Sequence, residues 1–133
     1  MRRDVINYRR ERAKETIDEA KLLFENDKLF ATVNRIYYAV FYEVNALLLI
    51  KSLVSSKHTG VRAYFNKEFI KTGIIPERHG RFYNKIFGFR QRSDYEDFVE
   101  FNKEQVRVWL LQAEDFLRTV ESVLEKLIND HSE

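Results

Sequence analysis

The sequence is short of the residues that build turns and covalent cross-links: its 133 residues include no cysteine, one proline and four glycines. The absence of cysteine excludes disulfides, zinc ribbons, thiol catalysis and iron–sulfur ligation. Average usage would supply about nine glycines and seven prolines, and all-β folds need such residues at closely spaced turns. The shortage therefore predicts an all-α protein, and the length fits a single domain over residues 1–133.

Long hydrophobic runs are also missing. The most apolar stretch, Ile36–Ile50, is interrupted by Glu43 and Asn45 and is too short to span a bilayer. The N-terminal residues lack the apolar core of a signal peptide. We therefore expect a cytoplasmic protein with no membrane partner.

Apolar residues recur at helical spacing along the chain. This periodicity predicts helices over residues 4–25, 28–52, 60–72, 76–90 and 97–129. Three of these helices are long and two are short, so the predicted architecture is an antiparallel (up-and-down) bundle of four to five helices. The helix that contains Ile36–Ile50 is apolar nearly all round and is expected to be central or to lie in a subunit interface.

A few residues mark the expected ends of these helices. Gly73 predicts a C-terminal stop, and Pro76 suits the first turn of the next helix. Ser93–Glu96 has the Ser-x-x-Glu form of a capping box and predicts the start of the last helix. Gly80 and Gly88 each weaken the fourth helix by roughly 1 kcal/mol relative to alanine, which indicates close packing or a kink.

Charge is unevenly distributed although the net charge is only +2. Residues 51–92 carry ten Lys or Arg against two acids, and residues 93–133 carry four against eleven. Such asymmetry is typical of a surface that binds nucleotide or nucleic acid. It is equally explained by basic and acidic segments that lie side by side and neutralise each other.

The basic segment also contains aromatic residues. Guanidinium groups bind phosphate through a bidentate fork, and aromatic rings stack on bases. The alternative is that the rings belong to the core and the cations form the wet face of an amphipathic helix. The cations concerned are Arg78, Arg81, Lys85, Arg90 and Arg92, with His79 among them.

Arg90, Asp94 and Tyr95 are the candidates for the centre of a site. The spacing of Arg90 and Asp94 is that of a local ion pair, which is the simpler explanation. In the alternative, Arg90 binds phosphate while Asp94 and Tyr95 orient it, and Arg92 assists.

Four further polar residues are candidates for ligand binding. Asn34 and Arg35 lie on the central helix and either bond to neighbouring helices or face a polar cleft, because a buried polar group needs partners. Lys57 and His58 lie in a loop before a helix whose N-terminus favours anions, although a solvated loop explains them as well.

Motifs for cofactors and metals are absent. No glycine-rich phosphate loop, nucleophile elbow or Glu-x-x-His pair for a di-iron centre occurs. The three histidines, His58, His79 and His131, lie far apart in the sequence. We therefore expect no cofactor and no metal.

Three motifs in this order resemble the HEPN domain family, and most closely its small stand-alone prokaryotic branch, over residues 8–127. Each motif is weak alone, but the three together in an all-helical chain of this length are fairly specific. They are Asn34-Arg35-x-Tyr37-Tyr38-Ala39-x-Phe41, Ser56-Lys57-His58-x-Gly60 and Phe89-Arg90-Gln91-Arg92-Ser93-Asp94-Tyr95.

The resemblance implies a helical bundle that is commonly a homodimer, binds nucleotide or RNA, and often has a minimal nucleotidyltransferase as its partner. Catalytic members are metal-independent ribonucleases with an Arg followed four to six residues later by a His. Arg90 matches that Arg, but Tyr95 and Glu96 stand five and six residues after it, and no His follows before His131. Since His is the natural proton-transfer group near neutral pH, this departure argues against an enzyme.

The predicted function is therefore a HEPN-type protein that binds nucleotide or RNA phosphates through Arg90, with help from Arg35, Lys57 and Arg92, in a toxin–antitoxin-like system. One alternative is a metal-independent ribonuclease toxin in which His58 or His79 replaces the missing histidine in space. The other is a non-catalytic helical interaction protein whose charge segregation is only internal complementarity.

Overall fold

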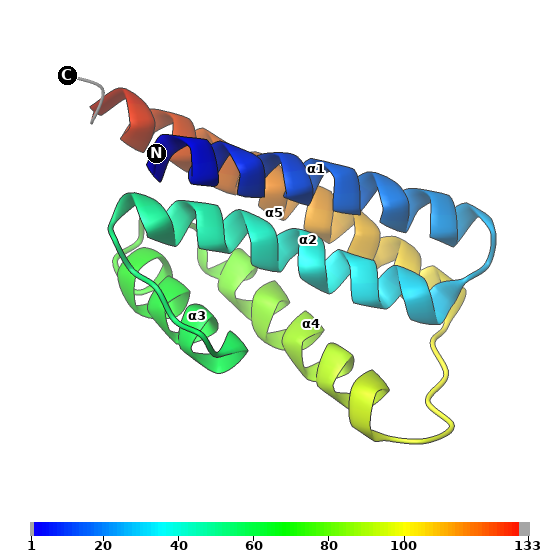
Figure 1. Cartoon of the computed structure of the whole chain (residues 1–133). Coiled ribbons are helices and arrows are strands. Elements are labelled where there is room, and N and C mark those ends of the chain that lie inside the picture. The colour runs from blue at the N-terminus through cyan, green and yellow to red at the C-terminus, as the bar shows by residue number, and fades with distance from the viewer. Residues whose placement is uncertain (1, 131–133) are drawn as a thin grey trace.

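The computed structural model describes residues 2–130 and confirms the all-α bundle. These residues form five α-helices and one π-helical turn, with no strand. The four longest helices run alternately in opposite directions, and the short third helix lies beside them (Figure 1). No helix within residues 2–130 is both long and apolar enough to cross a membrane. The elements are α1 (Arg2–Glu25), α2 (Leu29–Ile50), α3 (His58–Phe65), η1 (Asn66–Ile70), α4 (Glu77–Tyr95) and α5 (Lys103–Asp130).

The first two helices form a long antiparallel pair. The apolar stripe of α1 is buried, and α1 ends at Glu25 as its sequence predicts. The chain reverses through Asp27, which has a φ of 60°. The Asp27 side chain pairs with Lys103 at the start of α5, so the turn is also tied to the last helix. The residues of the stripe are Ala13, Ile17, Ala20 and Phe24.

The second helix is the centre of the bundle. It contacts α1, α3, α4 and α5, and most of its apolar residues are buried, although Phe30 near its start is 50% exposed. The apolar stretch Ile36–Ile50 predicts a helix that is either central or part of a subunit interface. The burial confirms the central position, because the other helices of the same chain cover this stretch. The motif residues of α2 therefore lie on the central helix of the fold.

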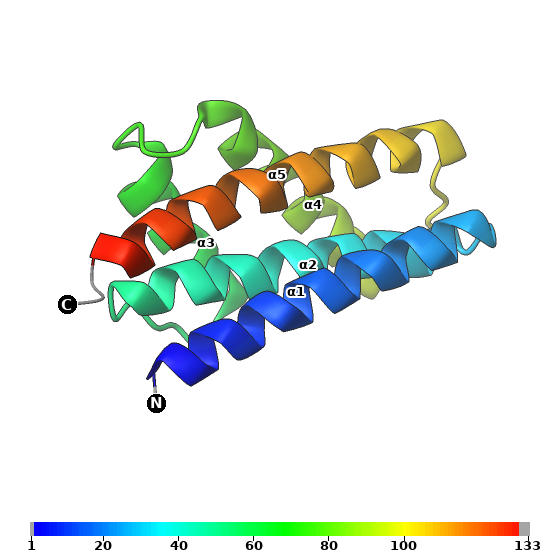
Figure 2. The same ribbon diagram turned by 90° about the horizontal axis from the view of Figure 1, so that it is seen from above.

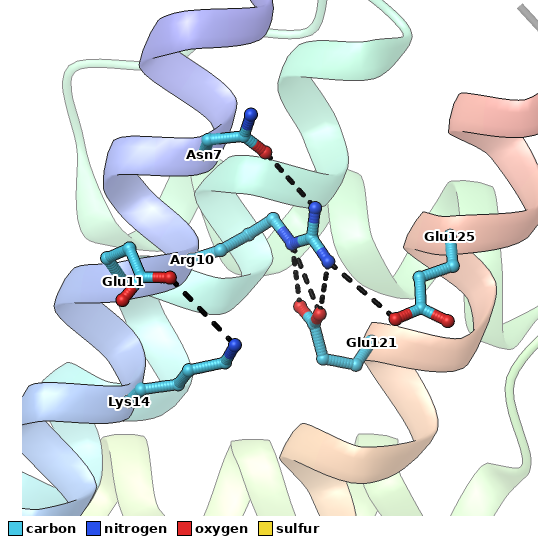
Figure 3. Close-up of polar contacts among 6 residues, drawn as sticks. All are labelled: Asn7, Arg10, Glu11, Lys14, Glu121 and Glu125. Atoms are coloured by element: carbon cyan, nitrogen blue, oxygen red, sulfur yellow. Dashed lines mark hydrogen bonds and ion pairs between the residues drawn. The ribbon is translucent and has the colours of Figure 1, made fainter.

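The fifth helix closes the bundle against α1 and α2 (Figure 2). Arg10 of α1 donates from Nε to both carboxylate oxygens of Glu121 on α5, at 3.1 and 3.0 Å, and its Nη2 lies 3.8 Å from Glu125 (Figure 3). Glu43 of α2 is only 2% exposed, and its Oε2 has no hydrogen-bond donor. Burial, followed by the interaction with Glu121, raises the pKa of Glu43 to about 10. A carboxyl group with so raised a pKa carries its proton near neutral pH, whereas the pKa of Glu121 beside Arg10 is lowered, so the proton of the pair belongs to Glu43.

Aromatic rings join α4 to α5. Trp109, the one tryptophan of the sequence, is 2% exposed. Its ring centroid lies 4.5 Å from that of Phe89 on α4 and 5.9 Å from that of Phe101, which precedes α5. Since Phe89 is adjacent to Arg90, this contact fixes the part of α4 that carries the candidate site residues.

The junction between α4 and α5 differs from the prediction. Helix α4 continues to Tyr95 instead of ending near Arg90, and α5 begins at Lys103 instead of near residue 97. The capping box at Ser93–Glu96 is wrong because Ser93 is buried within α4 and its hydroxyl donates to the carbonyl of Arg90. The cap of α5 is Asn102, whose Oδ1 accepts a hydrogen bond from the backbone N–H of Gln105 at 3.1 Å.

The short third helix also differs in detail. It begins at His58, earlier than predicted, and passes at Phe65 into the π-helical turn η1. Gly73 has a φ of 79° and ends the segment as its sequence predicts. Close packing is confirmed at Gly80, where an added Cβ atom would lie 3.1 Å from a side-chain atom of Ile70. The prediction of close packing is wrong for Gly88, where an added Cβ atom would have no neighbour within 4 Å.

Candidate functional site

Residues from α2, α3 and α4 converge on two adjacent tyrosines. Tyr37 is fully buried and Tyr38 half-buried, both on α2. The ring of His58, the first residue of α3, lies 5.7 and 5.9 Å from their ring centroids. The Cζ of Arg90 on α4 lies 5.1 and 5.6 Å from the same two centroids. We call Tyr37, Tyr38, Phe41, His58 and Arg90 the tyrosine cluster; it joins the three sequence motifs in space.

Arg90 is held by two neighbouring side chains. Its Nη2 donates to the hydroxyl of Tyr38 at 3.3 Å, and its Nε lies 2.9 Å from Oδ2 of Asp94. The ion pair that the spacing of Arg90 and Asp94 suggests is thus present. The side chain of Arg90 is 16% exposed, so these contacts do not enclose it completely.

His58 is fixed by stacking and by one hydrogen bond. Its ring lies 4.2 Å from that of Phe41 at an interplanar angle of 8°. Its Nδ1 lies 2.7 Å from the hydroxyl oxygen of Tyr37. Burial lowers the pKa of His58, and the charge of Arg90 lowers it further, against the opposing effect of Asp94. His58 is therefore a neutral imidazole near neutral pH, placed beside a guanidinium group.

Arg62 is a cation of this region that the sequence motifs do not include. It lies one helical turn after His58, and its Cζ is 4.0 Å from the ring centroid of Phe87. Burial raises the pKa of Tyr37, although the nearby charges of Arg90 and Arg62 oppose the effect. The signal in the sequence is the spacing of four residues from His58, which places both side chains on one face of a short helix.

The remaining predicted residues of α2 lie at the edge of the cluster. Arg35 stacks on the ring of Tyr38 with its Cζ 5.3 Å from the centroid and pairs with Glu19 at 3.7 Å. Its Nε and Nη2 both donate to Oδ1 of Asn34, at 3.1 and 2.8 Å. Both residues are half-buried. Their contacts are with each other, with Tyr38 and, through Glu19, with α1.

The other predicted residues near Arg90 point elsewhere. Arg92 stacks on Phe89 at 5.7 Å and pairs with Glu96 at 3.5 Å, so its contacts are not with the tyrosine cluster. Tyr95 is 83% exposed at the end of α4. Lys57 is exposed and immediately precedes α3. Of the predicted set, the structure thus brings together Arg90, Asp94 and His58, with Asn34 and Arg35 beside them.

Part of the basic segment pairs with acidic side chains of the same fold. Arg78 donates to Asp115 on α5 at 3.1 Å, and this hydrogen bond lowers the pKa of Asp115. Arg81 pairs with Glu77 within α4 at 3.8 Å. His79 is 2% exposed and its Nε2 lies 4.0 Å from Asp115, so its contacts are with α5 and not with Arg90. His131 lies outside the described residues.

The chemistry available at the cluster is that of anion binding and of proton donation. No group of three or more His, Asp or Glu side chains within residues 2–130 could hold a metal ion. The cluster brings a guanidinium group and a neutral imidazole together beside the half-buried rings of Tyr38 and Phe41. This combination suits a phosphate oxygen with a neighbouring planar base.

Comparisons with known proteins agree with these motifs. A family model described as "HEPN domain" matches residues 6–123. A UPF0332 protein of Thermotoga maritima is 51% identical over 123 residues, covering 92% of this chain and 93% of that protein. "Putative toxin MJ0142" of Methanocaldococcus jannaschii is 34% identical over 114 residues, covering 86% and 78% of the two chains. "Putative toxin MJ0605" of the same organism is 34% identical over 116 residues, covering 87% and 86%.

Proposed function

The chain belongs to the HEPN family, and on this premise we propose that it binds RNA or nucleotide phosphates through Arg90. We propose further that it acts as the toxin-like member of a pair with a minimal nucleotidyltransferase. The relatives that carry toxin names support the toxin-like role. The geometry of the tyrosine cluster supports phosphate binding through Arg90.

One observation carries the phosphate-binding proposal: the guanidinium group of Arg90 lies against Tyr37 and Tyr38, close to His58, and its side chain is 16% exposed. A guanidinium group binds phosphate oxygens through charge-assisted hydrogen bonds. Aromatic rings beside such a group suit a nucleotide base. A phosphate oxygen would therefore add to the contacts that Asp94 and Tyr38 make with Arg90.

The experiment is a binding titration of a labelled single-stranded RNA at low salt, followed by fluorescence anisotropy. We expect Arg90→Ala to weaken binding about tenfold to hundredfold, because hydrogen bonds to charged groups are worth about 1.5–3 kcal/mol. Arg90→Lys should recover only part of the loss, since lysine keeps the charge but not the planar fork.

Arg81→Ala is the matched control, because Arg81 is exposed on the same helix and its removal deletes the same charge. We expect it to weaken binding only about twofold. Thermal melting followed by circular dichroism should show that both variants are folded. Equal losses for Arg90→Ala and Arg81→Ala would contradict a specific site at Arg90.

A second function, metal-independent ribonuclease, is favoured by one observation: His58 lies on the same tyrosine pair as Arg90. The histidine that is missing after Arg90 in the sequence thus has a counterpart in space. The test is incubation of purified protein with RNA in the presence of EDTA. Cleavage that is lost in Arg90→Ala and in His58→Ala, but kept in Arg81→Ala, would establish this function. Absence of cleavage and of growth arrest on expression would exclude it.

The partner and the oligomeric state form a separate part of the proposal. We expect a homodimer, detectable by light scattering of the purified chain, and a complex with a nucleotidyltransferase encoded by a neighbouring gene. Co-expression should then relieve any growth arrest that the chain causes alone. A monomeric chain that neither binds nor is counteracted by that enzyme would overturn this part and leave phosphate binding unaffected.

A further inference from the structure

The hydroxyl group of Tyr37 is buried with one acceptor in reach. Tyr37 is fully buried, and among residues 2–130 the hydrogen-bond partner of its hydroxyl is Nδ1 of His58 at 2.7 Å. Tyr83, which interacts electrostatically with Tyr37, has a hydroxyl without any hydrogen-bond partner, so the two phenols are not bonded to each other. A buried hydroxyl donates where an acceptor exists, because an unpaired donor is costly. The Tyr37 hydroxyl therefore donates and Nδ1 of His58 accepts.

This hydrogen bond determines where His58 carries its proton. A neutral imidazole has one N–H group, and since Nδ1 accepts, that proton is on Nε2. A second proton on Nδ1 would face the Tyr37 hydroxyl and leave the phenolic hydrogen without an acceptor. The charged or titratable groups that face His58 are Tyr37 and Tyr38 on α2 and Arg90 and Asp94 on α4. Burial and the charge of Arg90 also disfavour a second proton on His58, as the hydrogen bond from Tyr37 does, whereas the charge of Asp94 favours it.

We propose that Tyr37 is a positioning residue that fixes His58 in the Nε2–H form, so that His58 donates a hydrogen bond to a phosphate oxygen beside Arg90. Only the identity of the ligand rests on the proposed function; the position of the proton does not. The stack of His58 on Phe41, with ring centroids 4.2 Å apart, holds the ring plane and hence the direction of the Nε2–H group.

The same arrangement decides between the two candidate functions. A base that removes the proton of a ribose 2′-hydroxyl needs a free nitrogen lone pair. In the Nε2–H form the lone pair of Nδ1 is occupied by Tyr37, and Nε2 has none to offer. His58 in this form binds phosphate and does not activate the hydroxyl, so the cluster is a binding site unless Tyr37 releases the ring.

The test is a long-range proton–nitrogen correlation spectrum of the ¹⁵N-labelled full chain without ligand, recorded across the titration range of histidine. His58 is assigned by its loss in His58→Gln. We expect a protonated Nε2 and an unprotonated Nδ1 in the neutral form. In Tyr37→Phe the stacking ring is kept and the donor is lost, so the titration midpoint should rise by about half a pH unit to one pH unit.

Tyr42→Phe is the matched control, because the Tyr42 hydroxyl interacts with Arg12 on α1. It should leave the His58 signals unchanged, and amide spectra should show that both variants are folded. A neutral wild-type His58 with its proton on Nδ1 would overturn the proposal, as would an unchanged midpoint in Tyr37→Phe.

Addition of inorganic phosphate to the labelled protein then tests the ligand separately. We expect the Nε2–H proton signal to move downfield in wild type and to move less in Arg90→Ala. If the Nε2–H form is found but phosphate does not move the signal, the positioning role of Tyr37 stands and the phosphate-binding role of His58 is overturned.

Discussion

Two glycines of α4 look equivalent in the sequence but occupy different environments. An added Cβ at Gly80 would lie 3.1 and 3.2 Å from Ile70, whereas Gly88 has open space around it. Gly88→Ala should stabilise the protein by about 0.5–1 kcal/mol because alanine favours the helix. Gly80→Ala gains the same propensity but must displace Ile70, so it should be less stable than Gly88→Ala by about 1–2 kcal/mol. Urea denaturation of the two variants measures this difference, and equal stabilities would contradict it.

For single residues, the sequence identifies which side chains are candidates for the site, but it does not show that they lie close together in space. Arg90 stands out through its neighbours in the chain, and His58 through its short motif. Their common contact with Tyr37 and Tyr38 depends on how α3 docks on α2, which no local pattern encodes. Arg62 carries no motif of its own and becomes visible only once α3 is known to begin at His58.

At the scale of elements, the contact between α1, α2 and α5 contains a titratable group that should make stability depend on pH. The pKa of Glu43 is raised from 4.5 to about 10 in the folded protein. Between these values the folded state binds one proton more than the unfolded chain, so stability falls as pH rises. Glu121 has a lowered pKa and is ionised in both states over most of this window. His58 and His79 have pKa values lowered from 6.5 and contribute the opposite slope below about that pH, so the contribution of Glu43 is measured by comparison with a variant.

Glu43→Gln removes this proton uptake and keeps a donor toward Glu121. We expect the variant to match wild type near pH 5 and to be more stable by about 1–3 kcal/mol near pH 8. Chemical denaturation at the two pH values provides the measurement. Glu125→Gln serves as the control, because Glu125 is 66% exposed and contacts the same arginine. A stability difference between wild type and Glu43→Gln that is the same at both pH values would refute the assignment of a neutral Glu43.

Helix existence is predictable from the sequence, whereas some helix ends are not. The stripe of α1 and the apolar stretch of α2 are local patterns, and both helices form as predicted. The last turn of α4 is decided by tertiary contacts, because Ser93 is buried and bonds back to its own helix instead of capping the next one. A serine can either cap a following helix or bond to a carbonyl of its own helix. Burial decides between these two roles, and burial cannot be read from the local sequence.

At the scale of the whole molecule, charge segregation is partly neutralised inside the fold. Arg78 bonds to Asp115, while Arg81 and Arg92 pair within and just beyond α4. Both explanations of the uneven charge therefore apply to different residues. The number of cations free to meet a phosphate backbone is smaller than the composition of residues 51–92 suggests.

This reduction should be visible in the salt dependence of RNA binding. With about three phosphate contacts and a slope near −0.7 per contact for a single strand, affinity should fall about tenfold to twentyfold between roughly 50 and 200 mM salt. The measurement is the same anisotropy titration at several salt concentrations. A fall of more than about a thousandfold would mean that the whole basic segment contacts phosphate, and the neutralised pairs would then have to open.

The contact of Trp109 with Phe89 gives the molecule an internal optical reporter. Trp109 carries the only indole of the sequence and is buried on α5. It contacts Phe89 on α4, which is the residue before Arg90. Emission of the folded protein should therefore be blue-shifted and should move to the red when α4 separates from α5. Any ligand that displaces α4 on reaching Arg90 would change this emission without an added label, so binding and helix movement can be followed in one cuvette.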